Sequence, residues 1–366
     1  MITSAASNPE AFAAFVRIAR AELPVKFVTE NLEKLLASKN FADIPSATLT
    51  ANQKQRIDLS WKTGGDDALV DRCALQNIKV IWSQNNERPN LLQHSESMPP
   101  FVFACGCETI AHSSSVAIVG TRSASSYAAE QTARFTHYLA EHGQIIVSGG
   151  AKGIDTIAHS EALRCHMPTI AVVATGLLRT YPRDNKALFD KIVLNGGLII
   201  SEYAPEAGPE PWKFPNRNRI IAALAKITLI AEAGNKSGAL ITAGFAATYG
   251  REVFVIPGPI DSGNNEGGHG LIRDGAQLVT HPSQLLPQTQ SLFEPGMVPD
   301  ERMARARISL TDTEKKVMAM IPTTGVLTAM ILETSHLPLS ETIAVITILE
   351  IKGAIRREPG GLLVPA

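Results

Sequence analysis

The chain has 366 residues, of which 45% are apolar and 19% are charged, and its formal net charge at pH 7 is -1. This composition is ordinary for a globular protein of two or three domains with a sizeable core. The near-zero net charge argues against a protein that coats duplex DNA through bulk positive charge, so any nucleic-acid site must be a local basic pocket.

The spacing of the cysteines bears on metal binding, and the charged residues near the N-terminus bear on the cellular location. Cys105-Gly106-Cys107 lacks the two-residue gap of a metal-binding knuckle, and Cys73 and Cys165 stand alone, so we predict free or structural thiols, no metal and no cofactor. Charged side chains at Glu10, Arg17 and Arg20 interrupt any apolar run. We therefore expect a cytoplasmic protein without a signal peptide or membrane insertion.

Residues 1–70 have helical periodicity, with apolar side chains at positions such as Phe12, Phe15, Val16 and Ala19. We predict a small helical domain over this range.

Residues 71–280 alternate short apolar runs with helical segments. This pattern predicts an α/β fold with a doubly wound, mainly parallel sheet and helices on both faces, to which residues 71–112 add an extension. The predicted strands are 78–82, 101–104, 116–119, 144–147, 170–174, 198–201, 227–231, 253–256 and 277–279. Ligands of such folds bind at the carboxyl ends of the strands.

Two of these strand ends carry glycines and polar residues. Gly120-Thr121-Arg122 follows strand 116–119, and Ser148-Gly149-Gly150-Ala151-Lys152-Gly153-Ile154-Asp155 follows strand 144–147. Such a turn lets backbone N–H groups approach a phosphate, although a tight connection without a ligand is an equal alternative. The spacing matches neither G-x-G-x-x-G nor, at Lys236-Ser237, a Walker A loop, which disfavours NAD and ATP.

An aromatic ring and two guanidinium groups stand close together at Phe214, Arg217 and Arg219. A ring that stacks on a base beside cations that hold phosphates suits single-stranded nucleic acid. The alternative is a capped helix with solvated arginines.

Four acidic or imidazole side chains could indicate catalysis. Asp155 and His159 are four residues apart and share a helix face, which suggests acid–base chemistry, but a helix-capping Asp and a hydrogen-bonded His explain them equally well, and we favour that structural role. Glu202 and Glu232 end strands, and we predict that they orient Arg217 or Arg219.

Taken together, these blocks resemble the DNA-processing protein A family (DprA, also called Smf). The resemblance covers residues 113–280 and rests on eight blocks in family order: Gly120 to Arg122, Ser148 to Asp155 with His159, Tyr181 to Asn185, Ser201-Glu202, Phe214 to Ile221, Ser237 to Ala243, Val255 to Gly258, and Leu271 to Ala276.

The resemblance implies an extended Rossmann-like core in a homodimer without enzymatic turnover. It implies a bacterial protein that binds and protects incoming single-stranded DNA and helps to load RecA recombinase during natural transformation. Members often carry a SAM-like or helix-hairpin-helix-like domain at the N-terminus, but residues 1–70 lack a Gly-x-Gly hairpin, which favours an interaction or spacer module.

Carried onto the matching positions, the resemblance predicts the DNA-binding residues. Phosphates are expected at the Gly149 and Gly150 amides and at Arg122 and Lys152, with a base stacked on Phe214. The full predicted set is Arg122, Ser148, Gly149, Gly150, Lys152, Phe214, Arg217, Asn218 and Arg219, to which Lys213 and Arg251 are added mainly for their charge.

Two other functions are alternatives. Nucleotide-processing enzymes of the same superfamily, which cleave a base from a ribose phosphate, have a Pro-Gly-Gly-x-Gly-Thr loop followed by a catalytic Glu. Here residues 232–238 read Glu-Ala-Gly-Asn-Lys-Ser-Gly and lack both features. An adaptor that acts only through its terminal domains would leave the basic strand ends unexplained.

Residues 281–309 contain four prolines and are predicted to be a linker. Helices near 312–320, 327–334 and 340–352, followed by a Gly-bounded hairpin, predict a winged-helix-like domain over residues 310–366. The helix at 340–352 has two glutamates and one lysine, so we favour a contact with protein over one with duplex DNA.

Overall fold

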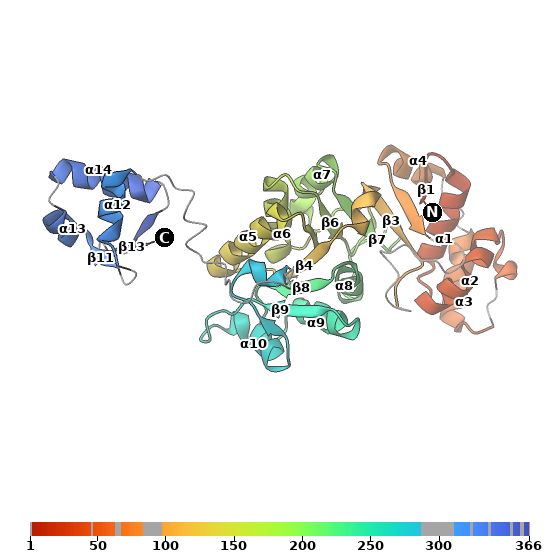
Figure 1. The fold of residues 1–366 in the computed structure, drawn as a ribbon. Coiled ribbons are helices and arrows are strands. Elements are labelled where there is room, and N and C mark those ends of the chain that lie inside the picture. Colours follow the sequence, from red (N-terminus) through yellow and green to blue (C-terminus); the bar gives the residue numbers. More distant parts are fainter. Residues whose placement is uncertain are drawn as a thin grey trace, which may run out of the picture. The chain divides into compact units, whose positions relative to one another are not determined.

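The computed structural model describes residues 2–44, 47–62, 67–82, 97–286, 311–322, 325–335, 338–351, 354–358 and 362–365. These belong to two compact units, residues 1–288 and residues 289–366 (Figure 1). Within the described parts, no helix combines the length and the apolar character needed to cross a membrane.

The described residues of the first unit form one ten-stranded sheet surrounded by helices. Its strands are β1 (Ile2–Ser4), β2 (Lys79–Trp82), β3 (Phe101–Gly106), β4 (Ser115–Val119), β5 (Ile145–Ser148), β6 (Thr169–Val172), β7 (Leu198–Ser201), β8 (Ile227–Ile230), β9 (Glu252–Val255) and β10 (Gln277–Leu278). Its α-helices are α1 (Pro9–Arg20), α2 (Val25–Ala37), α3 (Ala51–Lys62), α4 (Asp67–Leu75), α5 (Ser126–Glu141), α6 (Ile154–Arg164), α7 (Lys186–Leu194), α8 (Lys213–Leu224), α9 (Gly238–Thr248) and α10 (Glu266–Arg273). Short 3-10 turns lie at η1 (Phe41–Asp43), η3 (Glu108–His112), η4 (Arg183–Asn185), η5 (Gly263–Asn265) and η6 (Pro282–Leu285).

The strand order determines where a ligand can bind. The sheet reads β1-β2-β3-β7-β6-β5-β4-β8-β9-β10. Strands from β7 to β10 in this order are parallel, whereas β1, β2 and β3 extend the sheet in antiparallel fashion. The chain builds outwards in one direction from β4 through β7 and in the other from β8 through β10. The carboxyl ends of β4 and β8 therefore flank a topological switch point, where open α/β sheets bind their ligands.

Both faces of the central sheet are covered, which confirms the predicted α/β fold. In β4, Ala117 and Val119 belong to one apolar cluster, with residues of α8 and α9, while Val116 and Ile118 belong to another, with residues of α5 and α6. All five residues of β4 are buried. A parallel strand buried on both faces appears in sequence as a continuous apolar run, and that is why these strands were predictable.

The N-terminal helices share a core with the edge of the sheet. β1 pairs with β2, and one apolar cluster extends from Ala5 in the first turn to Phe103 in β3. Within it, the ring of Phe15 lies 5.0 Å from that of Phe101 and 5.3 Å from that of Trp82. These contacts join the predicted helical domain, residues 1–70, to the sheet extension. The boundary between the two, at residue 70, stays a prediction.

At the other end of the first unit, part of the predicted linker packs against the sheet's helices. Leu285, in η6, is buried in the cluster that contains Phe135 of α5. The rest of the predicted linker, from residue 287 to residue 309, lies outside the described residues.

The second unit has the elements of a winged helix. They are α12 (Asp312–Ala319), β11 (Val326–Leu327), α13 (Thr328–Thr334), α14 (Leu339–Ile351), β12 (Ile355–Glu358) and β13 (Leu362–Pro365), and the described strands pair in the order β11-β13-β12. Thr311 and Glu314 form a capping box at the start of α12. The core of this second unit contains Val317, Ile346 and Leu349.

Candidate functional site

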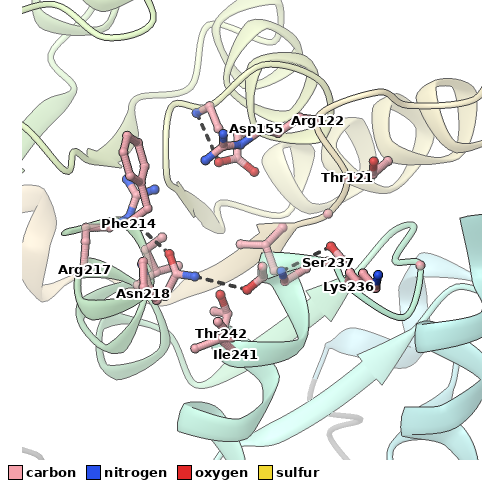
Figure 2. A pocket seen from close by; sticks show the side chains of 18 of the residues that line it. Thr121, Arg122, Asp155, Phe214, Arg217, Asn218, Lys236, Ser237, Ile241 and Thr242 are labelled. Carbon is pink, nitrogen blue, oxygen red and sulfur yellow. Dashed lines mark hydrogen bonds between the residues drawn. The ribbon is translucent and has the colours of Figure 1, made fainter. Parts of the chain in front are cut away.

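A pocket of about 760 Å³ opens at the switch point between β4 and β8 (Figure 2). Its walls come from the loop after β4, the loop after β8, and the first turns of α8 and α9. The lining residues with polar or aromatic side chains include Thr121, Arg122, Asp155, Tyr181, Phe214, Arg217, Asn218, Lys236, Ser237, Thr242 and Asn264. The sequence predicts Arg122, Phe214, Arg217 and Asn218 in one site, and the structure brings these four together.

Phe214 lies at the centre of a cluster of rings and cations. The guanidinium carbon of Arg122 is 5.1 Å from the centroid of the Phe214 ring, and the Tyr181 ring meets Phe214 edge to face at 5.4 Å. Arg122 and Tyr181 are exposed, and Phe214 is half-buried. A half-exposed ring beside a cation can accept a planar base by stacking.

Arg217 is a buried part of the wall. Its guanidinium donates hydrogen bonds to the carbonyls of Gly149, at 2.6 Å, and of Val172, and its Nε donates to Asn218 Oδ1. Burial lowers the pKa of Arg217 to about 10, partly opposed by the charge of Asp155, so the side chain keeps its positive charge at neutral pH. Arg217 therefore fixes α8 to the ends of β5 and β6.

Asn218 joins the same wall to the opposite side of the pocket. Its Nδ2 donates to the carbonyl of Gly238, the first residue of α9. Asn218 is 9% exposed, and both its Oδ1 and its Nδ2 take part in these bonds within the protein.

The glycine-rich turn after β5 is occupied by the protein's own carboxylate. The N–H groups of Gly149 and Ala151 donate to Oδ2 of Asp155, at 3.1 and 3.2 Å. Gly150 is packed against the ring of Phe189. Asp155, in the first turn of α6, thus already supplies an acceptor for the Gly149 amide, and a phosphate at this amide stays a prediction.

Lys152 and Gly149 line a smaller cavity of about 70 Å³. Arg122, Tyr181 and Phe214 border this cavity as well as the larger pocket. Lys152 is exposed and pairs with Asp184. Of the predicted cations, Arg122 and Lys152 are thus the two that remain accessible near Phe214.

Four other predicted residues do not line the pocket. Ser148 is fully buried and donates to the carbonyl of Ile118 at 2.6 Å. Arg219 is 3% exposed and pairs with Glu202. Arg251 precedes β9 and so lies at the amino edge of the sheet, opposite the pocket. Ser148 and Arg219 support the fold through these contacts, and so does Lys213.

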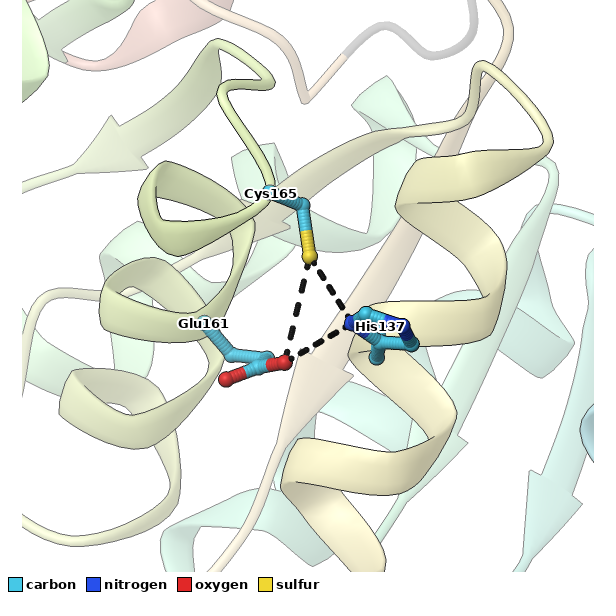
Figure 3. A group of neighbouring side chains, drawn as sticks. All are labelled: His137, Glu161 and Cys165. Carbon is cyan, nitrogen blue, oxygen red and sulfur yellow. Dashed lines mark hydrogen bonds and ion pairs between the residues drawn. The ribbon is translucent and has the colours of Figure 1, made fainter. Parts of the chain in front are cut away.

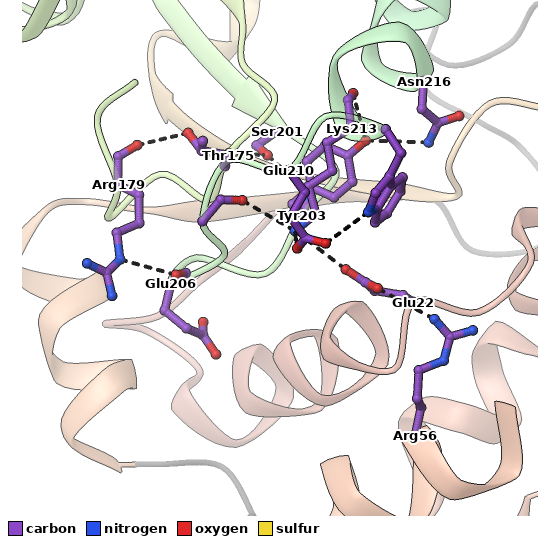
Figure 4. A network of polar contacts seen from close by, with 12 residues as sticks. Glu22, Arg56, Thr175, Arg179, Ser201, Tyr203, Glu206, Glu210, Lys213 and Asn216 are labelled. Carbon is purple, nitrogen blue, oxygen red and sulfur yellow. Dashed lines mark hydrogen bonds and ion pairs between the residues drawn. The ribbon is translucent and has the colours of Figure 1, made fainter. Parts of the chain in front are cut away.

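Lys213 is predicted to contact DNA mainly for its charge, and the structure gives it internal partners instead (Figure 4). Its side chain is 2% exposed, and Nζ lies 2.7 Å from Glu210 and 3.5 Å from Glu22, which ends the turn after α1. Nζ also lies over the rings of Tyr203 and Trp212, at 5.1 and 5.4 Å. Lys213 therefore ties the start of α8 to the N-terminal helices, one residue before Phe214.

Two features of the pocket were missing from the predicted site. Lys236 is an exposed cation in the loop after β8. Ser237 follows it and caps α9, its Oγ accepting from the N–H of Ala239. The positive end of α9 therefore opens onto the pocket, as in many phosphate sites. The signal was present in the sequence, where Lys236-Ser237-Gly238 lies between a strand and a helix.

The possible catalytic groups have structural partners. His159 is fully buried, hydrogen-bonds Thr169 at 2.8 Å and has its pKa lowered to about 3, first by burial and then by the charge of Arg217. Asp155 accepts the N–H groups of Gly149 and Ala151 and does not cap α6, whose N-cap is Gly153; the hydrogen-bonded His159 is as predicted, whereas the helix-capping role of Asp155 is not. Glu202 orients Arg219 as predicted, whereas Glu232 accepts the N–H of Ser125 and contacts neither arginine.

Two family models match the chain. The model described as DNA recombination-mediator protein A matches residues 79–290, and the DprA winged helix domain model matches residues 301–361. Among curated relatives, Protein Smf of Escherichia coli is 37% identical over 242 residues, which are 66% of this chain and 64% of that protein. The DNA processing protein DprA of Streptococcus pneumoniae is 47% identical over 173 residues, 47% of this chain and 61% of the relative. The aligned regions thus span less than two thirds of these two relatives.

Two solved structures are similar in fold and in sequence. The X-ray structure of DNA processing protein A from Streptococcus pneumoniae has a TM-score of 0.62 and 33% identity, covering 79% of this chain and 99% of that one. A structure of DNA processing protein A from Helicobacter pylori has a TM-score of 0.51 and 31% identity, covering 56% of this chain and 93% of that one. The latter structure gives insight into the single-stranded DNA binding mode of the Helicobacter pylori protein.

Proposed function

Because the chain belongs to the DNA recombination-mediator protein A family, also called DprA or Smf, we propose that it binds single-stranded DNA in the pocket between β4 and β8. The observation that carries this proposal is the grouping of Phe214 and Tyr181 with Arg122, Lys236 and the start of α9 around one opening. Rings that stack on bases, beside groups that attract phosphates, match the exposed bases and backbone of a single strand.

The shape and polarity of the site support a single strand over a duplex. A pocket of about 760 Å³ has the size of a small-molecule site and receives an unstacked nucleotide, whereas base pairs hold the bases of a duplex inside the stack. The accessible cations are few, in keeping with the formal net charge of -1. Affinity must therefore come from stacking together with a small number of phosphate contacts.

In this proposal the phosphates contact Arg122, Lys236 and the N-terminal end of α9. Lys152 can also contact a phosphate when its ion pair with Asp184 is broken. The buried residues Arg217 and Asn218 act indirectly, since their hydrogen bonds hold α8 and thereby Phe214 in place. This assignment replaces the glycine amides predicted from the sequence with the cap of α9.

The biological role that we propose is the family's role in DNA uptake and recombination. The chain protects incoming single strands in the cytoplasm and, as a homodimer, helps to load a RecA-type recombinase onto them. The description of the matching family as a recombination mediator and the single-stranded DNA binding of the Helicobacter pylori relative support this proposal. The winged-helix unit is proposed to contact protein.

We further propose that the chain acts without turnover. The buried His159 and the engaged Asp155 have no free role in acid–base catalysis. The rival base-cleaving function needs a carboxylate in the loop after β8, but Glu232 is 2% exposed and is engaged by Ser125.

The test is fluorescence-anisotropy binding of a labelled, unstructured single strand and of the matching duplex, at two salt concentrations. The proposal predicts a preference for the single strand that Arg122→Ala greatly weakens for every sequence, because phosphate contacts carry no base information. Equal affinity for single strand and duplex, or full affinity in the Arg122→Ala variant, would reject it.

A further inference from the structure

Three side chains with metal-binding atoms meet where α5 packs against α6 (Figure 3). His137 comes from α5, Glu161 from α6, and Cys165 directly follows α6. Both helices start at the carboxyl edge of the sheet and return towards its amino edge, so this cluster lies away from the DNA pocket. We propose that His137, Glu161 and Cys165 bind a divalent transition metal of the zinc class.

The distances between the three candidate ligand atoms fit a tetrahedral ion. His137 Nδ1 lies 3.2 Å from Glu161 Oε1 and 3.1 Å from Cys165 Sγ, and the Sγ–Oε1 distance is 3.8 Å. Zinc bonds of about 2.0 Å to nitrogen and oxygen and about 2.3 Å to sulfur, at tetrahedral angles, place such atoms about 3.3 to 3.6 Å apart. Small side-chain adjustments therefore suffice to bring all three onto one ion.

The neighbours of the cluster orient these atoms as the outer groups of a metal site do. Glu141 Oε1 lies 3.2 Å from His137 Nε2, so the imidazole can donate there and present the Nδ1 lone pair to the ion. Arg164 Nε donates to Glu161 Oε2 at 2.7 Å, leaving Oε1 directed to the cluster. Metal-binding histidines and carboxylates usually have such partners.

Arg164 also marks where a positive charge is favoured. Its Nη2 lies 2.5 Å from Glu161 Oε1 and 3.3 Å from His137 Nδ1, so one cationic nitrogen faces two of the three ligand atoms. The Arg164 side chain is 66% exposed and can move into solvent, whereas Glu161 is 11% exposed and stays in place. A metal ion would replace this nitrogen, and the fourth position would hold water or a group from another molecule.

Protonation links binding to pH. The pKa of the Cys165 thiol is raised, first by burial and then by the charge of Glu161, so the free chain carries a protonated thiol at neutral pH. Metal binding must displace this proton, because the thiolate is the form that binds a metal. The Glu161 carboxylate is already ionised, since the Arg164 hydrogen bond lowers its pKa.

Titration of the full chain with Co²⁺ tests the site, because thiolate-to-cobalt charge transfer absorbs in the near-ultraviolet and tetrahedral Co²⁺ absorbs in the visible. We expect one Co²⁺ per chain, displaceable by Zn²⁺. Cys165→Ser should remove the charge-transfer band, and Glu141→Gln should weaken binding about 10- to 100-fold.

A Cys105→Ser/Cys107→Ser double variant is the matched control, because these are the other partly exposed thiols, and it should keep the band. Circular dichroism confirms folding of each variant, and single-strand affinity should be unchanged in Cys165→Ser, which separates this site from the DNA pocket. A chain without the band, or a band that persists in Cys165→Ser and disappears in the double variant, would overturn the proposal.

Discussion

The guanidinium group of Arg122 lies over the ring of Phe214, with its central carbon 5.1 Å from the ring centroid. The arginine comes from the loop after β4 and the phenylalanine from α8, so the contact joins the two walls of the pocket. A cation over an exposed ring contributes about 0.5 to 1 kcal/mol. In the proposed single-strand site, the two side chains should therefore act as one unit.

Phe214→Ala should weaken single-strand binding by about 1 to 3 kcal/mol, the usual contribution of a base stacked on an aromatic ring. Phe214→Leu is the control, because it keeps apolar volume but offers no ring. Anisotropy titrations should show a loss in both variants, and a wild-type affinity in the alanine variant would remove Phe214 from the site.

Combining Arg122→Ala with Phe214→Ala should cost less than the sum of the two single losses, because residues in contact are coupled. A double-mutant cycle of single-strand affinities measures this coupling. Strictly additive losses would mean that the contact between the two side chains has no part in binding.

Lys236→Ala should reduce the salt dependence of single-strand binding. Loss of one phosphate contact lowers the slope of log affinity against log salt by about 0.7 for a single strand. Lys226→Ala is the matched control, because Lys226 is also exposed but lies before β8, at the opposite edge of the sheet. The same change of slope in both variants would rule out a specific role for Lys236.

Lys213→Met should lower the free energy of unfolding by about 1 to 3 kcal/mol and leave the salt slope unchanged. The cost stays below that of breaking a fully buried ion pair because Glu22 and Glu210 can reach water, their side chains being 31% and 51% exposed. Denaturant unfolding and salt titrations measure the two effects. A lower salt slope with unchanged stability would return Lys213 to the DNA site.

Much of the fold was readable from the sequence because the central strands are buried on both faces. Residues 116–119, 198–201 and 227–231 were predicted almost at their observed bounds. β1 was missed, since a three-residue strand has no periodicity and exists through its pairing with β2. The order of the strands could not be read either, and this order places β8 beside β4.

The site was only partly predictable for the same reason. Arg122 and Phe214 were found from their local patterns, but Lys236 reaches them through strand order alone. Conversely, Arg219 and Lys213 look in the sequence like residues of a basic surface. The sequence does not reveal that Arg219 pairs with Glu202, and Lys213 with Glu22, inside the fold. Asp155 was expected to cap a helix. The sequence did not reveal that its carboxylate accepts the N–H of Gly149 instead.

Stability should fall as the pH is lowered through the range set by His159. Its pKa is 6.5 in an unfolded chain and about 3 in the fold, so between these values the unfolded chain takes up a proton that the folded chain does not bind. From this group the free energy of unfolding should drop by about 2 kcal/mol between pH 7 and pH 5. Denaturant unfolding of the wild type and His159→Gln measures it; an equal drop in both would contradict the assignment.

The central claim is that a single strand lies against Phe214 and Tyr181. Photo-crosslinking of a single-stranded oligonucleotide that carries a halogenated uracil, followed by mass spectrometry of the peptides, locates the contact directly. We expect crosslinks to peptides that contain Phe214 or Tyr181, lost when excess unlabelled single strand competes. Crosslinks confined to the winged-helix unit or to the N-terminal helices would contradict it.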